Sequence, residues 1–466
     1  MSTHYGSPIG KIRAAVIICC FILIIGIFAY ALITNTNGEV GPKDEILARL
    51  EALEGKDLGY DEVSSYLKEY GITNIITYKI DGIEEQLKTE FYKPLPEEKD
   101  LARATVLLFV EHYYDNIDLE NKNQVTDAIL KCIFDSIGDP YAYYRTKAEF
   151  DEYLAGLEGG NEFVGIGVMM NQETLEILMV YPDSGAEEAG IKPCDVIYAV
   201  DGKTLADVSS KEELLDLVKG EENTTVAVTV KRGEELIDFT VTRRRLTERS
   251  VYHSMDTDSD GNTVGIIQLM QFQRNTPAQF TEAVDYCMKN GAKALVIDVR
   301  YNPGGLIDAV CAVIDYLVPD AEDRRIGSYA QLGDEYVYYT KDNHSVDVPV
   351  VVICNEGTAS AGELFTAAMR DYGEEGVMDT VIIGTTTFGK GVAQTSYSLY
   401  DGSGITFTIG YFNPPCDVNF DGVGVIPEIE VEEVASVDAP LSRALEEAAR
   451  LIGNNSDAEN DIGNAA

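Results

Sequence analysis

The sequence predicts a protein of mixed α/β class, because helical segments and short strands follow one another along the chain. Three short apolar runs have the composition of buried strands, and a polar or glycine-rich break follows each of them: Ala294–Val299, Val348–Ile353 and Val381–Gly384. Between the last two, Ala361–Arg370 has helical composition with apolar residues on one face. Upstream, Thr225–Val230 and Ile237–Thr242 alternate apolar and polar residues, as paired strands do.

Length and composition limit the classes of function. A chain of 466 residues, 45% of them hydrophobic, is long enough for two or three domains with a sizeable core. The net charge of −43 argues against nucleic-acid binding, which needs Lys and Arg to meet the phosphates, and against docking of the folded part on anionic lipid. None of the eight cysteines forms a CxxC pair, so we interpret them as small buried hydrophobic residues rather than a disulfide framework or zinc site.

The N-terminal segment predicts a membrane anchor. Residues 1–13 carry Lys11 and Arg13, and residues 14–33 are then twenty positions without a charge, enough to span a bilayer as a helix. Positive charge before the span puts residues 1–13 in the cytoplasm and the rest outside. A cleaved signal peptide, cut near Ala29-Tyr-Ala31, is the alternative, but the apolar run is longer than is usual for one. We expect a single-pass protein of the cell membrane.

The region after the predicted anchor divides into four segments that differ in sequence pattern. Residues 34–95 contain no recognisable chemistry, and we interpret them as a stalk or an unassigned extracytoplasmic segment. Residues 96–158 carry apolar stripes at helical spacing, and within them Asp139–Tyr144 predicts a turn that ends a helix. Residues 159–246 predict a small β domain with a hairpin turn at Val200-Asp-Gly202 and one helix near 211–219. Residues 247–435 hold the buried strands described above.

Ser360 and Lys390 are the candidate chemistry of the segment 247–435. Each follows an apolar strand, so both could emerge at one edge of a sheet, where a lysine base could activate a serine nucleophile. The lysine must be neutral to do so, and free lysine titrates near ~10.4, so the site would have to bury it. Two plainer interpretations stay open from the residues alone. Ser360-Ala-Gly-Glu363 fits a helix capping box, and a lysine between glycines is commonly solvent-exposed.

Histidine positions weigh against a Ser-His-Asp triad. The four histidines are His4, His112, His253 and His344, and none follows Ser360, which excludes the order Ser…Asp…His. The order His…Asp…Ser remains formally open through His253 or His344, without a local motif to support it. His112 is interpreted as a helix-face residue.

Three motifs together resemble the carboxyl-terminal processing proteases, also called tail-specific proteases. They are Asp298-Val-Arg-Tyr-Asn-Pro-Gly-Gly305, Asn355-Glu-Gly-Thr-Ala-Ser-Ala-Gly-Glu363 and Phe388-Gly-Lys-Gly-Val-Ala-Gln394. The resemblance covers roughly residues 98–435. It implies a crotonase-like (ClpP/crotonase) protease core of mixed α/β fold with an inserted PDZ domain.

By this resemblance, Ser360 is the nucleophile, Lys390 the general base, and Gln394 the residue that orients Lys390. The developing oxyanion would be stabilised by the Ala361 N–H and by a glycine N–H from Gly304 or Gly305, since glycines at a strand end can present such groups. No metal and no cofactor are implied.

The small β domain is similar to the PDZ domain of that family. Phe163-Val-Gly-Ile-Gly-Val168 resembles the loop whose N–H groups bind a peptide carboxylate, which implies peptide binding by Val164, Gly165, Ile166 and Gly167. Two residues depart from the family pattern. Cys194 stands where glycine is usual, and Gly185 where proline is usual.

Two further segments have alternative interpretations. Asp417-Val-Asn419-Phe-Asp421-Gly422, with Glu428 at the twelfth position, matches a calcium-loop spacing. Prolines before and within it disfavour flanking helices, and it resembles a turn of the family instead. Asp256–Gly261 imitates half a calcium loop and predicts a polar hairpin. Residues 436–466 predict a C-terminal helix, with a disordered tail from Asn454.

The combined prediction is a membrane-anchored, extracytoplasmic serine endopeptidase that cuts protein or peptide substrates near their free C-termini, gated by the PDZ domain. It needs no nucleic acid, and oligomers are compatible with it. The alternative is a catalytically inactive PDZ scaffold that binds protein C-termini; an acyl-transfer enzyme such as a transpeptidase is a weaker option.

Overall fold

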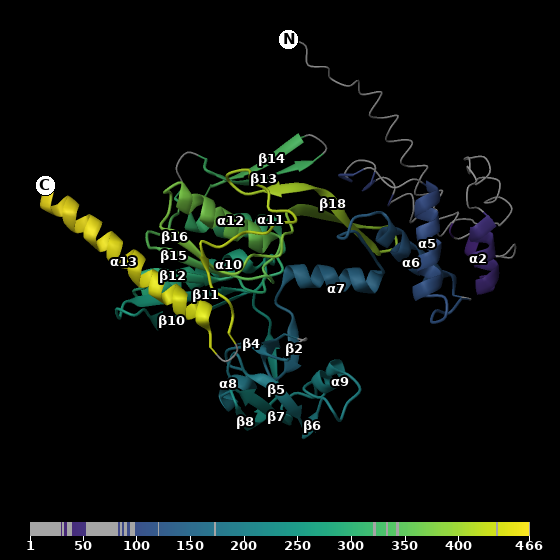
Figure 1. Ribbon diagram of the computed structural model, residues 1–466, viewed down its shortest axis with the longest axis horizontal. Coiled ribbons are helices and arrows are strands. Elements are labelled where there is room, and N and C mark those ends of the chain that lie inside the picture. Colours follow the sequence, from purple (N-terminus) through teal and green to yellow (C-terminus); the bar gives the residue numbers. More distant parts are fainter. Residues whose placement is uncertain are drawn as a thin grey trace, which may run out of the picture. The chain divides into compact units, whose positions relative to one another are not determined.

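The structure is a computed structural model that describes residues 98–465, apart from short gaps at 120, 172–173, 320–322, 332–333, 342–343 and 435–436 (Figure 1). Before residue 98 it describes only residues 29, 32–34, 40–52, 83, 86–87 and 91–93. The predicted membrane helix at 14–33 therefore lies almost wholly outside the described residues, as does most of the segment 34–95. Within the described part of the chain, no helix is both long and apolar enough to cross a membrane.

The described residues divide into two compact units, and the first comprises those within 1–154, 329–336 and 392–412. Its helices include α2 (Lys43–Ala52), α5 (Glu98–His112), α6 (Lys122–Ser136) and the start of α7 (Lys147–Glu158). The helices α5 and α6 are those predicted from the apolar stripes in 96–158, and their apolar faces are buried.

The sheet of the first unit contains β18 (Gly404–Asn413), which pairs antiparallel with β1 (Tyr143–Arg145) and β17 (Val392–Ser398). It also contains β13 (Arg325–Gln331) and β14 (Asp334–Tyr339). The buried carboxylate of Asp139 accepts the Thr408 N–H at 2.9 Å and the Thr408 hydroxyl at 3.1 Å. The predicted turn at Asp139 is thus fastened to β18.

The second unit contains a six-stranded sheet, in the order β10 (Val251–Thr257), β11 (Thr263–Leu269), β12 (Ala294–Asp298), β15 (Val350–Cys354), β16 (Thr380–Gly384) and β19 (Ile429–Glu430). The strands β10 and β11 form the polar hairpin predicted around Asp256–Gly261 and are antiparallel, whereas every other pairing is parallel. All residues of β12 and β15 are buried. Burial on both faces explains why these strands read as unbroken apolar runs.

Helices cover both faces of this sheet. On one side pack α10 (Thr276–Lys289), α11 (Ile307–Leu317) and α12 (Ala361–Glu374). On the other lies α13 (Ala439–Ala465), the yellow helix in Figure 1, whose Ala444, Ala448 and Leu451 share a buried cluster with Val296 and Val351.

The helix α13 corrects the prediction of a disordered tail from Asn454, because it runs on to Ala465. A helix that is already nucleated gains one hydrogen bond for each residue it adds, and Asn454–Ala465 contains no proline to stop it.

The small β domain also belongs to the second unit. It consists of β2 (Glu162–Gly165) paired with β9 (Arg244–Thr247), β3 (Val168–Met170) paired with β4 (Ile177–Val180), and a sheet in the order β6 (Lys203–Thr204), β5 (Val196–Val200), β7 (Thr225–Arg232) and β8 (Glu235–Thr242). Two short helices, α8 (Gly185–Ala189) and α9 (Lys211–Asp216), pack on one apolar cluster with these strands. Asp201 and Gly202 both have positive φ, which is the two-residue hairpin turn predicted from the sequence.

The two departures from the family pattern have local structural explanations. Cys194 adopts a φ of 67°, in the left-handed region that favours glycine. A side chain at Gly185 would bring its Cβ to 1.9 Å from the Thr242 carbonyl oxygen, so a proline would not fit there without movement of β8. Four of the six described cysteines are buried, as predicted, whereas Cys194 is half-buried and Cys416 is exposed.

Candidate active site

Three segments leave the same edge of the six-stranded sheet. The strands β12, β15 and β16 are parallel, with Ile353 beside both Asp298 and Ile383, so their C-terminal ends lie together. Residues 299–306, 355–360 and 385–391 follow those ends. These are the three motif segments singled out in the sequence, and parallel pairing brings them to one place.

Ser360 lies between β15 and α12 in a backbone conformation, φ 54° and ψ −116°, that L residues rarely adopt. Bonds on its N-terminal side hold the chain in this conformation. The Thr358 hydroxyl donates to the Val299 carbonyl at 2.8 Å, and the Ala359 N–H donates to the Asn302 carbonyl at 2.8 Å. Strain of this kind persists only where the surroundings over-determine it, and it concentrates at functional sites.

The Glu363 carboxylate connects the segment of Ser360 to the segment of Lys390. Glu363 is fully buried (0% exposed), and its carboxylate accepts four hydrogen bonds, as a buried charge requires. Oε2 accepts the Ser360 N–H at 2.8 Å and the Lys390 N–H at 2.7 Å. Oε1 accepts the Thr387 hydroxyl and the Gly389 N–H, both at 2.6 Å. The sequence pattern indicated Glu363 only as a capping residue, and the bond to Ser360 N–H is that capping contact.

The shared oxygen fixes how near the two predicted catalytic residues are. Because Ser360 N and Lys390 N bind the same oxygen, they can be no farther apart than the sum of the two bonds, about 5.5 Å. Lys390 is half-buried. The glycines beside it permit a close backbone approach, since a Cβ at Gly391 would lie 2.5 Å from Asn419 Oδ1.

The turn 302–305 lies against Ser360. A Cβ at Gly304 would be 2.7 Å from the Ser360 Cβ and 2.9 Å from the Ala361 nitrogen, so only glycine fits there. The Gly304 N–H already donates to Asn302 Oδ1 at 2.9 Å. The N–H groups of Gly305 and Ala361 donate to no other residue in the described part of the chain. Of the two glycines predicted as oxyanion donors, Gly305 is therefore the one whose N–H is available.

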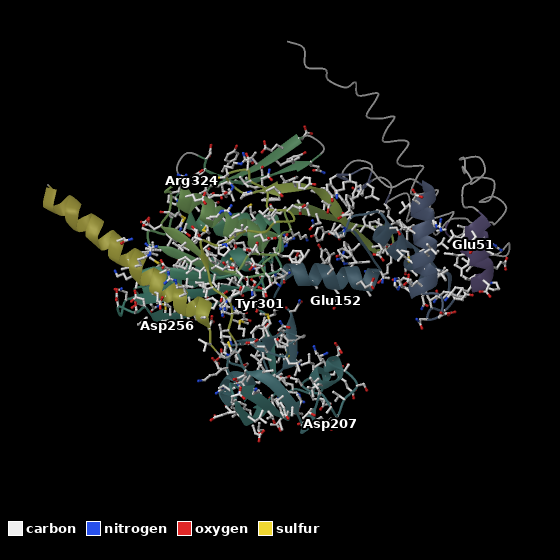
Figure 2. All side chains as sticks on the ribbon, in the orientation of Figure 1. Glu51, Glu152, Asp207, Asp256, Tyr301 and Arg324 are labelled. Atoms are coloured by element: carbon white, nitrogen blue, oxygen red, sulfur yellow. The ribbon has the colours of Figure 1, made fainter. Side chains whose placement is uncertain are left out.

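A partly buried ion-pair network supports this turn. Arg300 contacts Asp298 at 2.6 Å and Asp438 at 2.9 Å. Burial alone would lower the pKa of Arg300, but the two carboxylates outweigh it and raise that pKa above its ordinary value. Asp438 directly precedes α13, so the network ties the C-terminal helix to the loop after β12. Tyr301, labelled in Figure 2, follows with a φ of 59° and donates its N–H to Asn355 Oδ1 at 2.9 Å.

The sequence alone indicates no role for Arg300, Asn302 or Asn355. All three lie in the motifs that carry the resemblance. The partners of these residues come from distant parts of the chain and are visible only in the fold.

The remaining predicted residues make other contacts. Gln394 is on β17, in the first unit, and its amide donates to the Val392 carbonyl at 2.9 Å. The Nδ1 atom of His344 lies 2.6 Å from the Tyr316 carbonyl oxygen, and the His344 ring stacks on Tyr316. His253 packs on Tyr286. Neither histidine contacts Ser360 through any hydrogen bond described, so the order His…Asp…Ser gains no support.

A groove of about 590 Å³ opens on the small β domain. The predicted peptide-binding residues line one side of it: Val164, Gly165, Ile166 and Gly167. The other side is formed by the α9 region, with apolar Leu215 and Val218 and charged Glu212, Asp216 and Lys219. Gly167 has a φ of 82°, and a Cβ there would lie 2.2 Å from the Ser184 Cβ, whereas a Cβ at Gly165 would meet only the Phe163 ring at 3.6 Å.

Among the residues that the structure describes, no group of three or more His, Cys, Asp or Glu side chains is arranged to hold a metal ion. The segment with calcium-loop spacing is included in that search.

The mostly parallel sheet carries at one edge a strained serine, a loop with a lysine, and two N–H groups that donate to no described residue. The small β domain has a groove lined by the predicted peptide-binding residues. These features together define a class of PDZ-containing serine peptidases. Comparison with known proteins agrees. Residues 263–431 match peptidase family S41, and residues 163–242 match the PDZ domain.

Curated relatives extend the match. A probable CtpA-like serine protease of Staphylococcus haemolyticus (strain JCSC1435) is 31% identical over 361 residues, which are 76% of this chain and 68% of that protein. A probable CtpA-like serine protease of Staphylococcus aureus (strain MRSA252) is 32% identical over 318 residues, 67% of this chain and 61% of that protein. The chain belongs to peptidase family S41 and is a serine-type peptidase.

Among solved structures, the photosystem II D1 C-terminal processing protease is similar, with 25% identity and a TM-score of 0.48. The match covers 82% of this chain and 100% of that one.

Proposed function

We propose that this peptidase cleaves protein substrates near their free C-termini with a Ser360/Lys390 dyad. The observation that carries the proposal is the shared Glu363 oxygen, which holds the backbones of Ser360 and Lys390 together at the sheet edge. The inactive PDZ scaffold is not favoured, because the relatives are named serine proteases and the chain keeps both a serine and a lysine at this edge.

The reaction is acyl transfer to serine followed by hydrolysis. Ser360 Oγ attacks the scissile carbonyl while neutral Lys390 takes the hydroxyl proton, and the lysine then gives that proton to the leaving amine. The N–H groups of Ala361 and Gly305 stabilise the tetrahedral oxyanion. Water, activated by Lys390, releases the acyl group and regenerates Ser360. Gln394 orients Lys390 in this scheme.

Kinetics of four variants test the dyad. Ser360→Ala and Lys390→Ala should each remove most activity, and the double variant should be little worse, since the pair acts as a unit. Lys390→Arg should not rescue, because arginine does not give up its proton. Activity should rise with pH as Lys390 deprotonates. Full activity of Lys390→Ala, or a flat profile from mildly acidic to alkaline pH, would refute the dyad.

The PDZ groove is proposed to select the substrate and to gate the enzyme. A free C-terminus would add as a strand along Val164–Gly167, with its carboxylate on backbone N–H groups and apolar side chains over Leu215 and Val218. Gating predicts a higher kcat with substrates that occupy the groove, whereas simple tethering predicts only a lower KM. Cleavage of matched substrates with free and amidated C-termini decides this, and equal rates would contradict selection by the groove.

The remaining parts of the proposal concern architecture and location. The proposed core is crotonase-like, and the proposed anchor is the uncharged segment 14–33, with residues 1–13 cytoplasmic and the catalytic part outside the cell membrane. Protease accessibility on intact cells and fractionation of a chain that lacks residues 1–33 test this topology. A shortened chain that still sediments with membranes would contradict an anchor there.

A further inference from the structure

The segment 417–428 has calcium-loop spacing, and the proposed chemistry leaves that spacing unexplained. Its acidic and amide side chains do not converge on one point. The Asp417 carboxylate pairs with Arg325, while Asn419 and Asp421 turn to Gly391, the residue after Lys390.

Asn419 and Asp421 bind both backbone polar groups of Gly391. The Asp421 carboxylate accepts the Gly391 N–H at 3.1 Å, and the Asn419 amide donates to the Gly391 carbonyl at 2.9 Å. The two side chains are themselves held in place. Asn419 Oδ1 accepts the Asp421 N–H at 2.8 Å, and the Asn419 amide also donates to Asn413 Oδ1 at 3.0 Å.

The loop of residues 385–391, called here the lysine loop, is therefore held from two sides. Glu363 binds the N–H groups of Gly389 and Lys390 from the side of α12. The segment 417–428 binds Gly391 through Asn419 and Asp421, and its Gly422 N–H donates to the Gly389 carbonyl at 2.9 Å. With bonds on the residues before and after it, the backbone of Lys390 has little freedom to shift.

We propose that Asn419 and Asp421 are positioning residues, which fix the backbone of the Lys390 loop so that the lysine amine stays within reach of the Ser360 hydroxyl. The inference rests on the proposed role of Lys390. The spacing Asp-x-Asn-x-Asp-Gly acts here as a backbone clamp rather than as a cation loop. A displacement of a catalytic group by about 1 Å lowers rate by roughly 10²-fold, so loss of the clamp is measurable.

The experiment compares Asn419→Ala, Asp421→Ala and Asp421→Asn with Asp417→Asn as the matched control from the same motif. Both alanine variants should lower kcat by about 10- to 100-fold with KM changed by less than about threefold. They should also move the acidic midpoint of the pH–rate profile upward, because a loosened lysine is better solvated and holds its proton to higher pH.

Two variants are expected to behave like the wild type. Asp421→Asn keeps an oxygen that accepts the Gly391 N–H, so it should retain most activity and the wild-type pH midpoint. Asp417→Asn, at a residue with a φ of 61° that asparagine tolerates, should leave the activity and the pH midpoint unchanged. If Asn419→Ala does not fold, the comparison of Asp421→Ala with Asp421→Asn, at an exposed residue, still tests the proposal.

The outcomes separate the clamp from the dyad. If Lys390→Ala is inactive while Asn419→Ala and Asp421→Ala keep the wild-type rate and pH midpoint, the clamp is refuted and the dyad stands. If Lys390→Ala is fully active, both proposals fall. If added calcium or a chelator changes activity, and Asp417→Asn loses as much as the alanine variants, a cation loop replaces the clamp.

Discussion

Glu363→Gln tests whether the buried carboxylate holds the site together. Glutamine has nearly the same volume, but only one of its two terminal atoms can accept a hydrogen bond. Each oxygen of Glu363 accepts two bonds, so the amide nitrogen must face one of these pairs. The amide nitrogen will face Thr387 and Gly389, because the Thr387 hydroxyl can rotate to accept a hydrogen bond. The backbone N–H groups of Ser360 and Lys390 can only donate, so they keep the glutamine oxygen. The Gly389 N–H is then left without a partner.

The magnitude follows from this count. One orphaned buried N–H costs roughly 1–3 kcal/mol, and the bonds from Ser360 and Lys390 weaken by about 1 kcal/mol in total when the acceptor becomes neutral. We expect the free energy of unfolding to fall by about 2–4 kcal/mol, measured by urea denaturation followed by circular dichroism. The lysine loop shifts with Gly389, so kcat should fall by about 10²-fold in a peptide-cleavage assay.

Glu356→Gln is the matched control, since Glu356 is exposed and accepts the Thr385 hydroxyl at 3.1 Å, which glutamine can still do. Its stability should stay within about 0.5 kcal/mol of the wild type. The reasoning is wrong if Glu363→Gln matches this control in both stability and turnover.

Three further predictions concern strain, pH and the groove. Ser360→Gly should be about 1–2 kcal/mol more stable than Ser360→Ala, because glycine relieves the unfavourable φ of 54°; equal urea midpoints would contradict this. Glu428 is exposed at the surface, but partial desolvation of its carboxylate still raises its pKa above the ordinary value, so folding favours the protonated form, and that contribution is lost as pH rises through the folded-state pKa. Glu428→Gln should therefore exceed the wild type in stability at pH 7, with an advantage that disappears below pH 4.5; a pH-independent difference would exclude Glu428 as the cause. Gly165→Asp fits sterically and puts a carboxylate on the groove wall, so it should weaken binding of free C-terminal peptides about tenfold or more while leaving phosphonate labelling of Ser360 unchanged; unchanged peptide affinity would count against this binding mode.

The sequence by itself determined the local elements and the order of the parts. Unbroken apolar runs predicted β12, β15 and β16 because strands buried on both faces have no polar side to show. Glycine next to Lys390, and a serine where strand gives way to helix, marked the candidate chemistry before any geometry was known. The one local prediction that was wrong, disorder from Asn454, failed because a polar composition does not prevent a nucleated helix from continuing.

Only the tertiary structure decided which groups meet. Glu363 looks in the sequence like an ordinary capping residue, yet parallel strand pairing brings Gly389 and Lys390 to its carboxylate. The segment 417–428 looks like a calcium loop, yet its side chains bind a backbone that lies far away in sequence. Hydrogen bonds between distant segments depend on the register and direction of strands, which local patterns do not encode. That is why the sequence could name Ser360 and Lys390 but not the residues that hold them together.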